Sequence, residues 1–234
     1  MSGDPALAAR LDAIRERIAA ACRRSGRRPE EVVLIGASKR QPAALLQSAW
    51  EAGLKVFGEN RVQEAAAKKP ELPPAAEWHL IGPLQSNKVK PALDLFSAVH
   101  AVDRLKIAHA LEHEAAERDQ EVLGFLEINL GGETTKHGFL PEGLVETVRP
   151  LAGRAHLRIV GLMAIPPPAP GAEGSRPWFR RLRELRDELA GSPGWRQFPG
   201  WLSMGMSDDF EVAIEEGASH VRVGTALFGP RPPA

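Results

Sequence analysis

Lys39 stands where a lysine could act as a nucleophile. It follows the apolar run VVLIGAS, so its aliphatic stem would pack against the end of a strand while its amine emerges at the rim of the fold. Partial removal from water lowers the pKa of a lysine amine, and the neutral amine can form an imine with an aldehyde. Periodicity alone also allows a solvated lysine that opens a helix, which is the commoner kind. Whether Lys39 is reactive therefore depends on the residues that lie opposite it.

A second group of residues, near the end of the chain, is suited to an anion. The run VRVGTALFG places Gly224 and Thr225 where a strand passes into a short helical turn. Free backbone N–H groups at such a turn, together with the Thr225 hydroxyl, can bind a phosphate. Ser203 and Met204 end the preceding strand and would complete the site from the neighbouring loop. A glycine alone is a weak indication because any tight turn needs one, so the pairing of the two positions predicts the phosphate site.

Two polar residues fall inside strand-like runs. Arg222 shares the strand face of Gly224, and an arginine inside a barrel is costly unless it has a partner. A buried ion pair with Glu127 or Asp209 is one explanation of Arg222. His79 lies in an apolar run, where a hydrogen-bonded core histidine is more common than a catalyst. Both residues are candidates for the site, and both have a purely structural alternative.

Short apolar runs rich in β-branched residues alternate with helix-like stretches along the chain. The eight candidate strands cover residues 32–37, 55–58, 78–82, 98–102, 122–130, 157–165, 201–204 and 221–224. The helical patterns lie at 42–52, 61–69, 87–93, 104–118, 141–151, 176–190 and 208–216, and an amphipathic helix over 5–24 precedes them all. Eight strand and helix units favour an α/β fold, a closed (β/α)8 TIM barrel formed as a single domain by residues 1–234, over an open doubly wound sheet. In such a barrel the residues that follow the strands meet at one mouth.

The composition excludes several classes of function. Lysine plus arginine and aspartate plus glutamate each number 30, so no charge excess points to nucleic acid or to a membrane surface. Cys22 is the only cysteine and the seven histidines lack the spacing of metal ligands, so neither a disulfide framework nor a metal site is expected. No apolar run resembles a signal peptide or a membrane span, and the expected location is the cytoplasm. Tyrosine is absent, so this chain offers no tyrosyl acid or base.

Seven strings of residues, spread from the first expected strand to the last, resemble one known family. They are GASK (36–39), FGENRVQEA (57–65), WHLIGPLQSNK (78–88), KHGF (136–139), GLMAI (161–165), LSMGMSDDFEVAI (202–214) and VRVGTALFGPR (221–231). Their order and joint presence resemble the pyridoxal phosphate homeostasis proteins, the single-domain group related to the barrel domain of bacterial alanine racemase. The resemblance implies that the chain binds pyridoxal 5'-phosphate (PLP) as its cofactor.

The resemblance also implies which residues bind PLP. Lys39 would carry it as an internal aldimine, a Schiff base, and Arg222 would contact the pyridine nitrogen. A guanidinium stays protonated and has no lone pair, so that nitrogen would remain unprotonated and the ring would be a poor electron sink. The further residues implied are Asn60 beside the ring, Ser203, Gly224 and Thr225 at the phosphate with Met204 in the same loop, and His79 and Met163 along the pocket. Arg61 stands where the family usually has an aromatic residue, so no contact is carried over there.

Three functions are compatible with these residues. The first is a carrier or buffer of PLP that influences vitamin B6 and amino-acid balance without turnover, and the second is an amino-acid racemase that uses PLP. Two-base racemases of the related barrel pair their lysine with a tyrosine from a second domain, and neither is expected here, which favours the carrier. The third is a barrel enzyme for an unrelated phosphorylated metabolite. Without the second domain a monomer is expected, and PLP-dependent apo-enzymes are candidate recipients of the cofactor.

Overall fold

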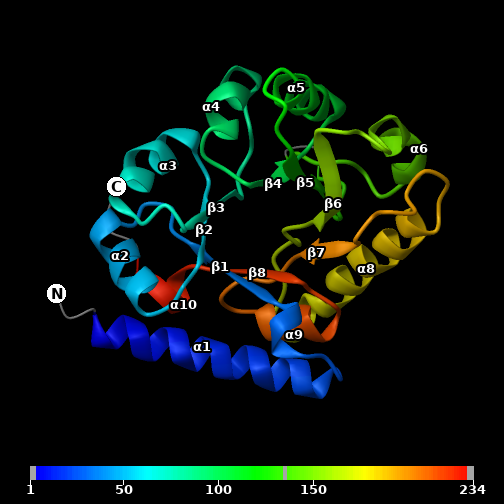
Figure 1. Ribbon diagram of the computed structural model, residues 1–234. Coiled ribbons are helices and arrows are strands. Elements are labelled where there is room, and N and C mark those ends of the chain that lie inside the picture. Colours follow the sequence, from blue (N-terminus) through cyan, green and yellow to red (C-terminus); the bar gives the residue numbers. More distant parts are fainter. Residues whose placement is uncertain (1–3, 134–135, 231–234) are drawn as a thin grey trace.

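Eight parallel strands close into a barrel in the order of the sequence (Figure 1). The computed structural model describes residues 4–133 and 136–230, so the two ends of the expected 1–234 domain and Arg231 of the last matching string lie outside the described residues. The strands are β1 (Val33–Ala37), β2 (Val56–Glu59), β3 (Glu77–Leu80), β4 (Ala98–Val102), β5 (Val122–Glu127), β6 (Leu157–Met163), β7 (Trp201–Ser203) and β8 (His220–Val223). Pairing of β1 with β8 completes the closure. The predicted (β/α)8 barrel is confirmed, and the open sheet is not formed.

Helices lie around the outside of the barrel (Figure 1). The α-helices are α1 (Pro5–Arg24), α2 (Ala43–Glu51), α3 (Val62–Lys68), α4 (Val89–Leu93), α5 (Leu105–Ala116), α6 (Leu144–Val148), α7 (Gly171–Gly174), α8 (Arg176–Ala190), α9 (Phe210–Glu215) and α10 (Thr225–Phe228). Four 3-10 turns are η1 (Pro29–Glu31), η2 (Lys69–Glu71), η3 (Ser86–Lys88) and η4 (Arg149–Leu151). None of the described helices is both long enough and apolar enough to cross a membrane.

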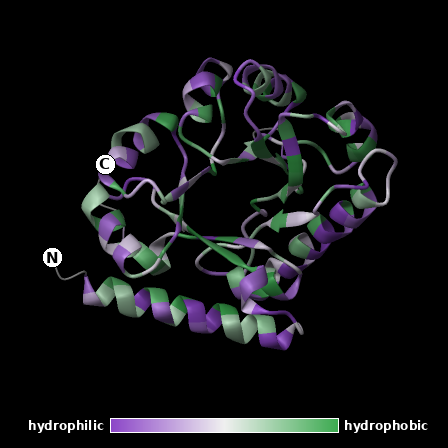
Figure 2. Cartoon of the chain, in the orientation of Figure 1, coloured by the Kyte–Doolittle hydropathy of each residue, from purple (hydrophilic) through white to green (hydrophobic). Residues whose placement is uncertain are grey.

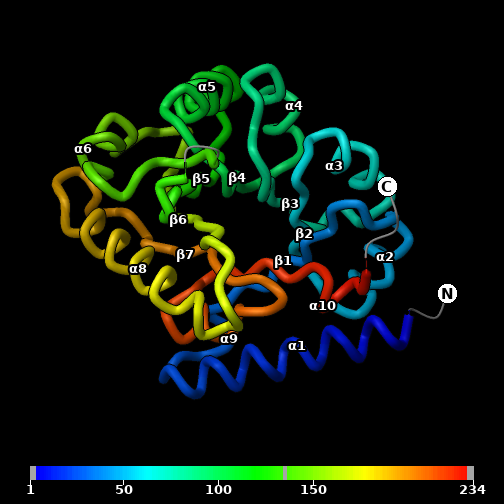
Figure 3. Tube along the Cα trace, turned by 180° about the vertical axis from the view of Figure 1, so that it is seen from behind, coloured from blue at the N-terminus to red at the C-terminus, as the bar shows by residue number. Residues whose placement is uncertain are grey.

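Helix α1 is the extra N-terminal helix that the spacing of its apolar residues predicts. Asp4 caps it by accepting from the backbone N–H groups of Ala6 and Leu7. Its buried face, which includes Leu11 and Ile14, packs against α9 and α10 outside the barrel. Figure 3, seen from behind, shows α1 running past both helices, and Figure 2 shows hydrophobic and hydrophilic residues alternating along it. The helix therefore braces the side of the barrel that β8 closes.

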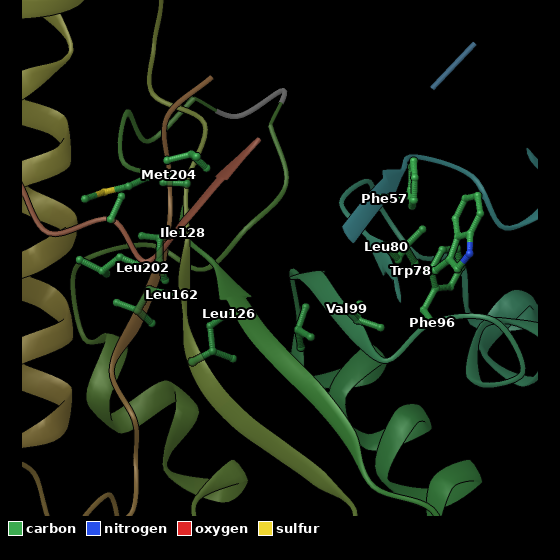
Figure 4. Close-up of a cluster of buried hydrophobic side chains, with 14 of the residues drawn as sticks. Phe57, Trp78, Leu80, Phe96, Val99, Leu126, Ile128, Leu162, Leu202 and Met204 are labelled. Carbon is green, nitrogen blue, oxygen red and sulfur yellow. The ribbon is translucent and has the colours of Figure 1, made fainter. Parts of the chain in front are cut away.

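The barrel has two apolar layers because successive side chains of a strand point to opposite faces. The outward-facing residues pack against the helices, and Figure 4 shows Phe57, Trp78, Leu80, Phe96, Val99, Leu126, Ile128, Leu162, Leu202 and Met204 from this layer. The rings of Phe57 and Trp78 stack there with centroids 5.5 Å apart. The inward-facing apolar residues are fewer and form two small clusters, one of them around Phe125 and Met163. The rest of the interior is polar.

Strand register brings Lys39 and Arg222 towards each other. Ile35 of β1 is paired with Arg222 of β8, and Ile35 packs inside the barrel with Val56 and Ile81. Alternation from Ile35 places Ala37 and then Lys39 on the interior side, at the carboxyl end of β1. The two polar residues thus face the same mouth although they lie 183 positions apart in the sequence.

Candidate functional site

A cavity of about 190 Å³ opens at the carboxyl ends of the strands. Its lining residues are Ala37, Lys39, Asn60, Ile81, Ile165, Met206, Ser207, Asp208, Arg222, Gly224 and Thr225. Five residues that the sequence nominates, Lys39, Asn60, Arg222, Gly224 and Thr225, therefore meet in one place. They come from β8 and from the segments that follow β1, β2 and β8. This is the face of a barrel on which loops build sites.

The chain immediately before Lys39 is held by a buried carboxylate. Glu59, at the end of β2, has no exposed side-chain surface and accepts hydrogen bonds from Ser38 Oγ at 2.8 Å and Lys68 Nζ at 2.7 Å. Lys68 Nζ also donates to the carbonyl oxygen of Ser38 at 2.9 Å. Burial raises the pKa of Glu59, while the ammonium of Lys68 opposes that shift. Together Glu59 and Lys68 fix the strand end from which the partly buried Lys39 projects.

Asn60 reaches the cavity because the segment that follows β3 leaves room for its backbone. A Cβ atom at Gly82 would lie 2.7 Å from the carbonyl oxygen of Asn60 and 2.8 Å from its Cα. Only glycine tolerates such an approach. Gly82 thus permits the close passage of the segments that follow β2 and β3.

Arg222 is almost fully buried at the base of the cavity, with 4% of its surface exposed. Its NH1 donates to the carbonyl oxygen of Ser203 at 2.7 Å and to Ser203 Oγ at 2.6 Å, and its NH2 donates to the carbonyl oxygen of Ala164 at 3.0 Å. These are neutral acceptors. Within the described part of the chain neither Glu127 nor Asp209 is in direct ion-pair contact with Arg222, although both carboxylates act on it electrostatically and favour its charged form. Burial lowers the pKa of Arg222 to about 10, so the guanidinium remains a cation at neutral pH.

Three of the five guanidinium N–H groups of Arg222 are used in these bonds. Among the described residues the other two have no acceptor, and Arg222 lines the cavity. An acceptor placed there would receive a hydrogen bond from a cation and would gain no proton from it.

Two backbone N–H groups converge on a serine hydroxyl at the cavity. Gly224 N and Ala226 N both donate to Ser207 Oγ at 3.3 Å. Ser207 belongs to the loop after β7, and the other two residues belong to the turn after β8. The loops after the seventh and eighth strands are where barrels often bind phosphate. An anion oxygen could accept the same N–H groups that now meet at the Ser207 hydroxyl.

Ser203 and Met204 do not line this cavity. Strand β7 ends at Ser203, which is fully buried and bonded to Arg222 inside the barrel. Met204 is also fully buried and packs in the outward-facing layer (Figure 4). Ser207, four residues further along the same string LSMGMS, lines the cavity instead. The missed signal was the second serine of that string, since periodicity did not mark the end of a three-residue strand.

His79 and Met163 lie deeper than the cavity, in the barrel interior. Met163 is 1% exposed and packs with Phe125 and Val160, and His79 is 4% exposed. His79 is not a lone core histidine, because His100 and His220 share the interior with it, at ring-centroid distances of 5.0 and 6.3 Å. Those two histidines are not among the candidate residues predicted from the sequence. The signal available was the same as for His79, a histidine inside a strand-like run.

Burial keeps His100 and His220 neutral. The pKa of His100 is well below its usual value because of burial first and the neighbouring histidines second. Burial lowers the pKa of His220 to about 3, and its Nδ1 lies 2.9 Å from Ser219 Oγ. Protonation of either ring would place an extra charge in the buried interior of the barrel.

The stability of the protein is expected to fall as pH drops below 6.5. His220 takes up a proton near pH 6.5 in the unfolded chain but only near pH 3 in the folded one, so between these values the unfolded state binds one proton more. His220 should therefore contribute a slope of about 1.4 kcal/mol per pH unit to the free energy of unfolding. Urea unfolding of the wild type and of His220→Gln at several pH values in this window measures that slope. Equal slopes in the two proteins would contradict the assignment.

The opening extends beyond the cavity into two neighbouring clefts. One of about 900 Å³ shares Asn60 and includes Arg61, which is exposed and does not line the cavity itself. Another of about 270 Å³ shares Ile165 and includes Glu127, whose pKa is raised by burial first and by the carboxylate of Asp103 second. Among the described residues, no group of three or more histidine, cysteine, aspartate or glutamate side chains is arranged to hold a metal ion.

The barrel, with its polar residues at the mouth, belongs to a known class of domain. Residues 9–232 match the family model described as alanine racemase, N-terminal domain. An alanine racemase of Clostridium difficile shares the fold, with a TM-score of 0.74 and 15% identity over 97% of this chain and 57% of that one.

Full-length relatives are closer in sequence. Proteins named pyridoxal phosphate homeostasis protein are 46% identical in Aquifex aeolicus, over 95% of this chain and 97% of that protein, and 43% identical in Pseudomonas aeruginosa, over 96% of both. The solved structure of PipY from Synechococcus elongatus with PLP bound has a TM-score of 0.83 and 37% identity over 95% of this chain and all of that one. The chain belongs to the family of pyridoxal phosphate homeostasis proteins.

Proposed function

We propose that this protein binds PLP and serves PLP and amino-acid homeostasis, without robust catalytic turnover, and that Lys39 is the residue that attaches the cofactor. One observation carries the proposal: a single cavity is lined by a lysine, a buried guanidinium with unused donors, and a turn whose N–H groups converge. The PLP bound to PipY and the names of the relatives support it. We take residues 1–234 to act as one cofactor-binding domain, because strands from both ends of the chain close the same barrel.

The residues present match the three functional groups of PLP. When bound, PLP supplies an aldehyde that condenses with a primary amine, forming one C=N bond and releasing one water. Lys39 Nζ provides that amine, and the two unused N–H groups of Arg222 provide donors for the pyridine nitrogen. Gly224 N, Ala226 N and the hydroxyls of Ser207 and Thr225 would bind the phosphate. Asn60 lies at the same cavity, where it would flank the ring.

Arg222 also limits what the bound cofactor could do. A guanidinium donates hydrogen bonds and stays charged, so it would leave the pyridine nitrogen without a proton. An unprotonated ring withdraws electrons poorly from an attached amino acid. This property favours a protein that binds and releases PLP over one that catalyses reactions with it. For this reason we propose the homeostatic role, with PLP-dependent apo-enzymes as recipients of the cofactor.

The phosphate site is tested by placing a negative charge in it. Ser207→Asp should weaken PLP binding about 100-fold, because a carboxylate at the Gly224 and Ala226 N–H groups would occupy the donors and repel the phosphate. Binding of pyridoxal, which has no phosphate, should change little. Fluorescence titration with both compounds measures the difference, and Ser86→Asp, an exposed serine on η3, is the matched control. Equal weakening for PLP and pyridoxal would contradict this assignment of the phosphate site.

A further inference from the structure

Five polar side chains form an unbroken hydrogen-bonded chain through the inside of the barrel. Arg222 NH1 lies 2.6 Å from Ser203 Oγ, which lies 2.8 Å from His100 Nδ1. His100 Nε2 lies 3.0 Å from His79 Nδ1, and His79 Nε2 lies 3.0 Å from Glu77 Oε1. The interior of such a barrel is ordinarily filled by branched apolar side chains. A polar path from the amino end of β3 to the cavity is therefore unusual for this fold and indicates a specific role.

The two ends of this chain fix the direction of every hydrogen bond in it. Arg222 can only donate, and the carboxylate of Glu77 can only accept. The side chain of Glu77 is 47% exposed, and its pKa is lowered, first by the hydrogen bond with His79, so it is ionised at neutral pH. Four hydrogen bonds then lie between a pure donor and a pure acceptor, and each needs one proton.

The protons can be placed in one consistent way when both histidines are neutral. Ser203 Oγ accepts from Arg222 and has one hydrogen, which it donates to His100 Nδ1. His100 is then the Nε2–H tautomer and donates to His79 Nδ1. His79 is likewise the Nε2–H tautomer and donates to Glu77. Each group in the middle accepts once and donates once, so none of these buried donors is left unpaired.

We propose that Glu77, His79 and His100 are positioning residues, which hold the Ser203 hydroxyl with its lone pair towards Arg222 and so aim the unused guanidinium donors into the cavity. This inference rests on the proposed function for what those donors bind. His100 is the central link because it is the group that takes the Ser203 proton. Without His100 the hydroxyl can turn, and Arg222 NH1 loses an acceptor that the chain polarises.

The hydrogen-bonded chain itself is tested on the protein without cofactor. Two-bond ¹H–¹⁵N correlation spectra of ¹⁵N-labelled protein report which ring nitrogen of each histidine carries its proton. The expected result is that His79 and His100 are both Nε2–H tautomers with an unprotonated Nδ1 at neutral pH. A proton on His100 Nδ1, or an imidazolium at either position, would overturn the proposal. This outcome does not depend on whether PLP binds.

The action on the cofactor is tested with PLP that carries ¹⁵N in its ring. His100→Leu breaks the chain, whereas His100→Gln keeps an acceptor and a donor as far apart as the two ring nitrogens. His220→Leu removes a histidine of the same interior, 5.8 Å from His100 between ring centroids, that is not part of the chain. We expect His100→Leu to shift the ring ¹⁵N resonance and to weaken PLP binding about tenfold, His100→Gln to restore both, and His220→Leu to leave the resonance unchanged.

Two results would overturn the positioning role. One is a wild-type resonance in His100→Leu, and the other is the same change in His100→Leu and His100→Gln. If His100→Leu does not fold, Glu77→Leu replaces it at the half-exposed end of the chain. Loss of the terminal acceptor should then give mixed tautomers at His79 and His100, and unchanged tautomers would overturn the proposal. Failure of the wild type to bind PLP would instead count against the proposed function.

Discussion

Lys39→Ala is expected to abolish covalent attachment of PLP and to weaken its binding by about 100-fold or more, since an imine bond is lost and hydrogen bonds alone remain. The visible absorbance that imine formation gives to PLP should disappear with it. Weak binding should persist, because Arg222 is held by Ser203 and Ala164 and the N–H groups of Gly224 and Ala226 belong to the backbone. Absorbance spectra and equilibrium dialysis with PLP measure the two effects separately.

Lys106→Ala is the matched control for this variant. Lys106 is exposed on α5, so its loss should leave the absorbance and the affinity unchanged. Retention of the visible absorbance in Lys39→Ala would show that another amine attaches the cofactor. Equal loss of covalent and weak binding in that variant would show that the phosphate site does not bind independently of Lys39.

The protein loaded with PLP is expected to catalyse no exchange of the Cα hydrogen of L-alanine beyond the rate of free PLP. A racemase needs a base on each face of the substrate and a ring that accepts electrons. The chain contains no tyrosine for the second face, and Arg222 would leave the ring nitrogen unprotonated. The difference from a racemase should therefore amount to many orders of magnitude in rate.

Incubation with L-alanine and other L-amino acids in deuterated water, followed by mass spectrometry and chiral analysis, measures this exchange. Lys39→Ala loaded with PLP serves as the background. Rapid deuterium incorporation with inversion of configuration would contradict the carrier role and favour the racemase. Incorporation without inversion would also contradict it, since it would show proton abstraction on one face.

The closed barrel could be predicted from the sequence because each strand alternates with a helical pattern and each helix repeats its apolar residues at helical spacing. The ends of the strands could not. The strand expected over 122–130 stops at Glu127, although Ile128 and Leu130 are both buried. Those residues pack in the outward-facing layer beyond the end of β5. Apolar periodicity does not distinguish a buried residue within a strand from a buried residue that follows it.

Apolar periodicity also determined which residues of the candidate site could be predicted, because it does not show where a strand ends. Lys39, Arg222, Gly224 and Thr225 could be predicted because each follows or shares the face of a strand-like run, whereas Asn60 was predicted from the family resemblance. Ser207 was missed because it lies in a loop, four residues beyond the end of β7, where no periodicity distinguishes it from Ser203. The partners of Arg222 were missed for another reason: two are backbone carbonyl oxygens, which have no signature in the sequence.

The central claim is that Lys39 is the attachment point of PLP, and chemical reduction tests it most directly. Borohydride converts an imine into a stable amine, so the purified protein incubated with PLP, reduced, digested and analysed by mass spectrometry reveals which lysine carries the cofactor. We predict a single phosphopyridoxyl adduct on the peptide that contains Lys39, formed at one equivalent of PLP. An unmodified Lys39 peptide after reduction, or an adduct spread over surface lysines, would contradict the claim.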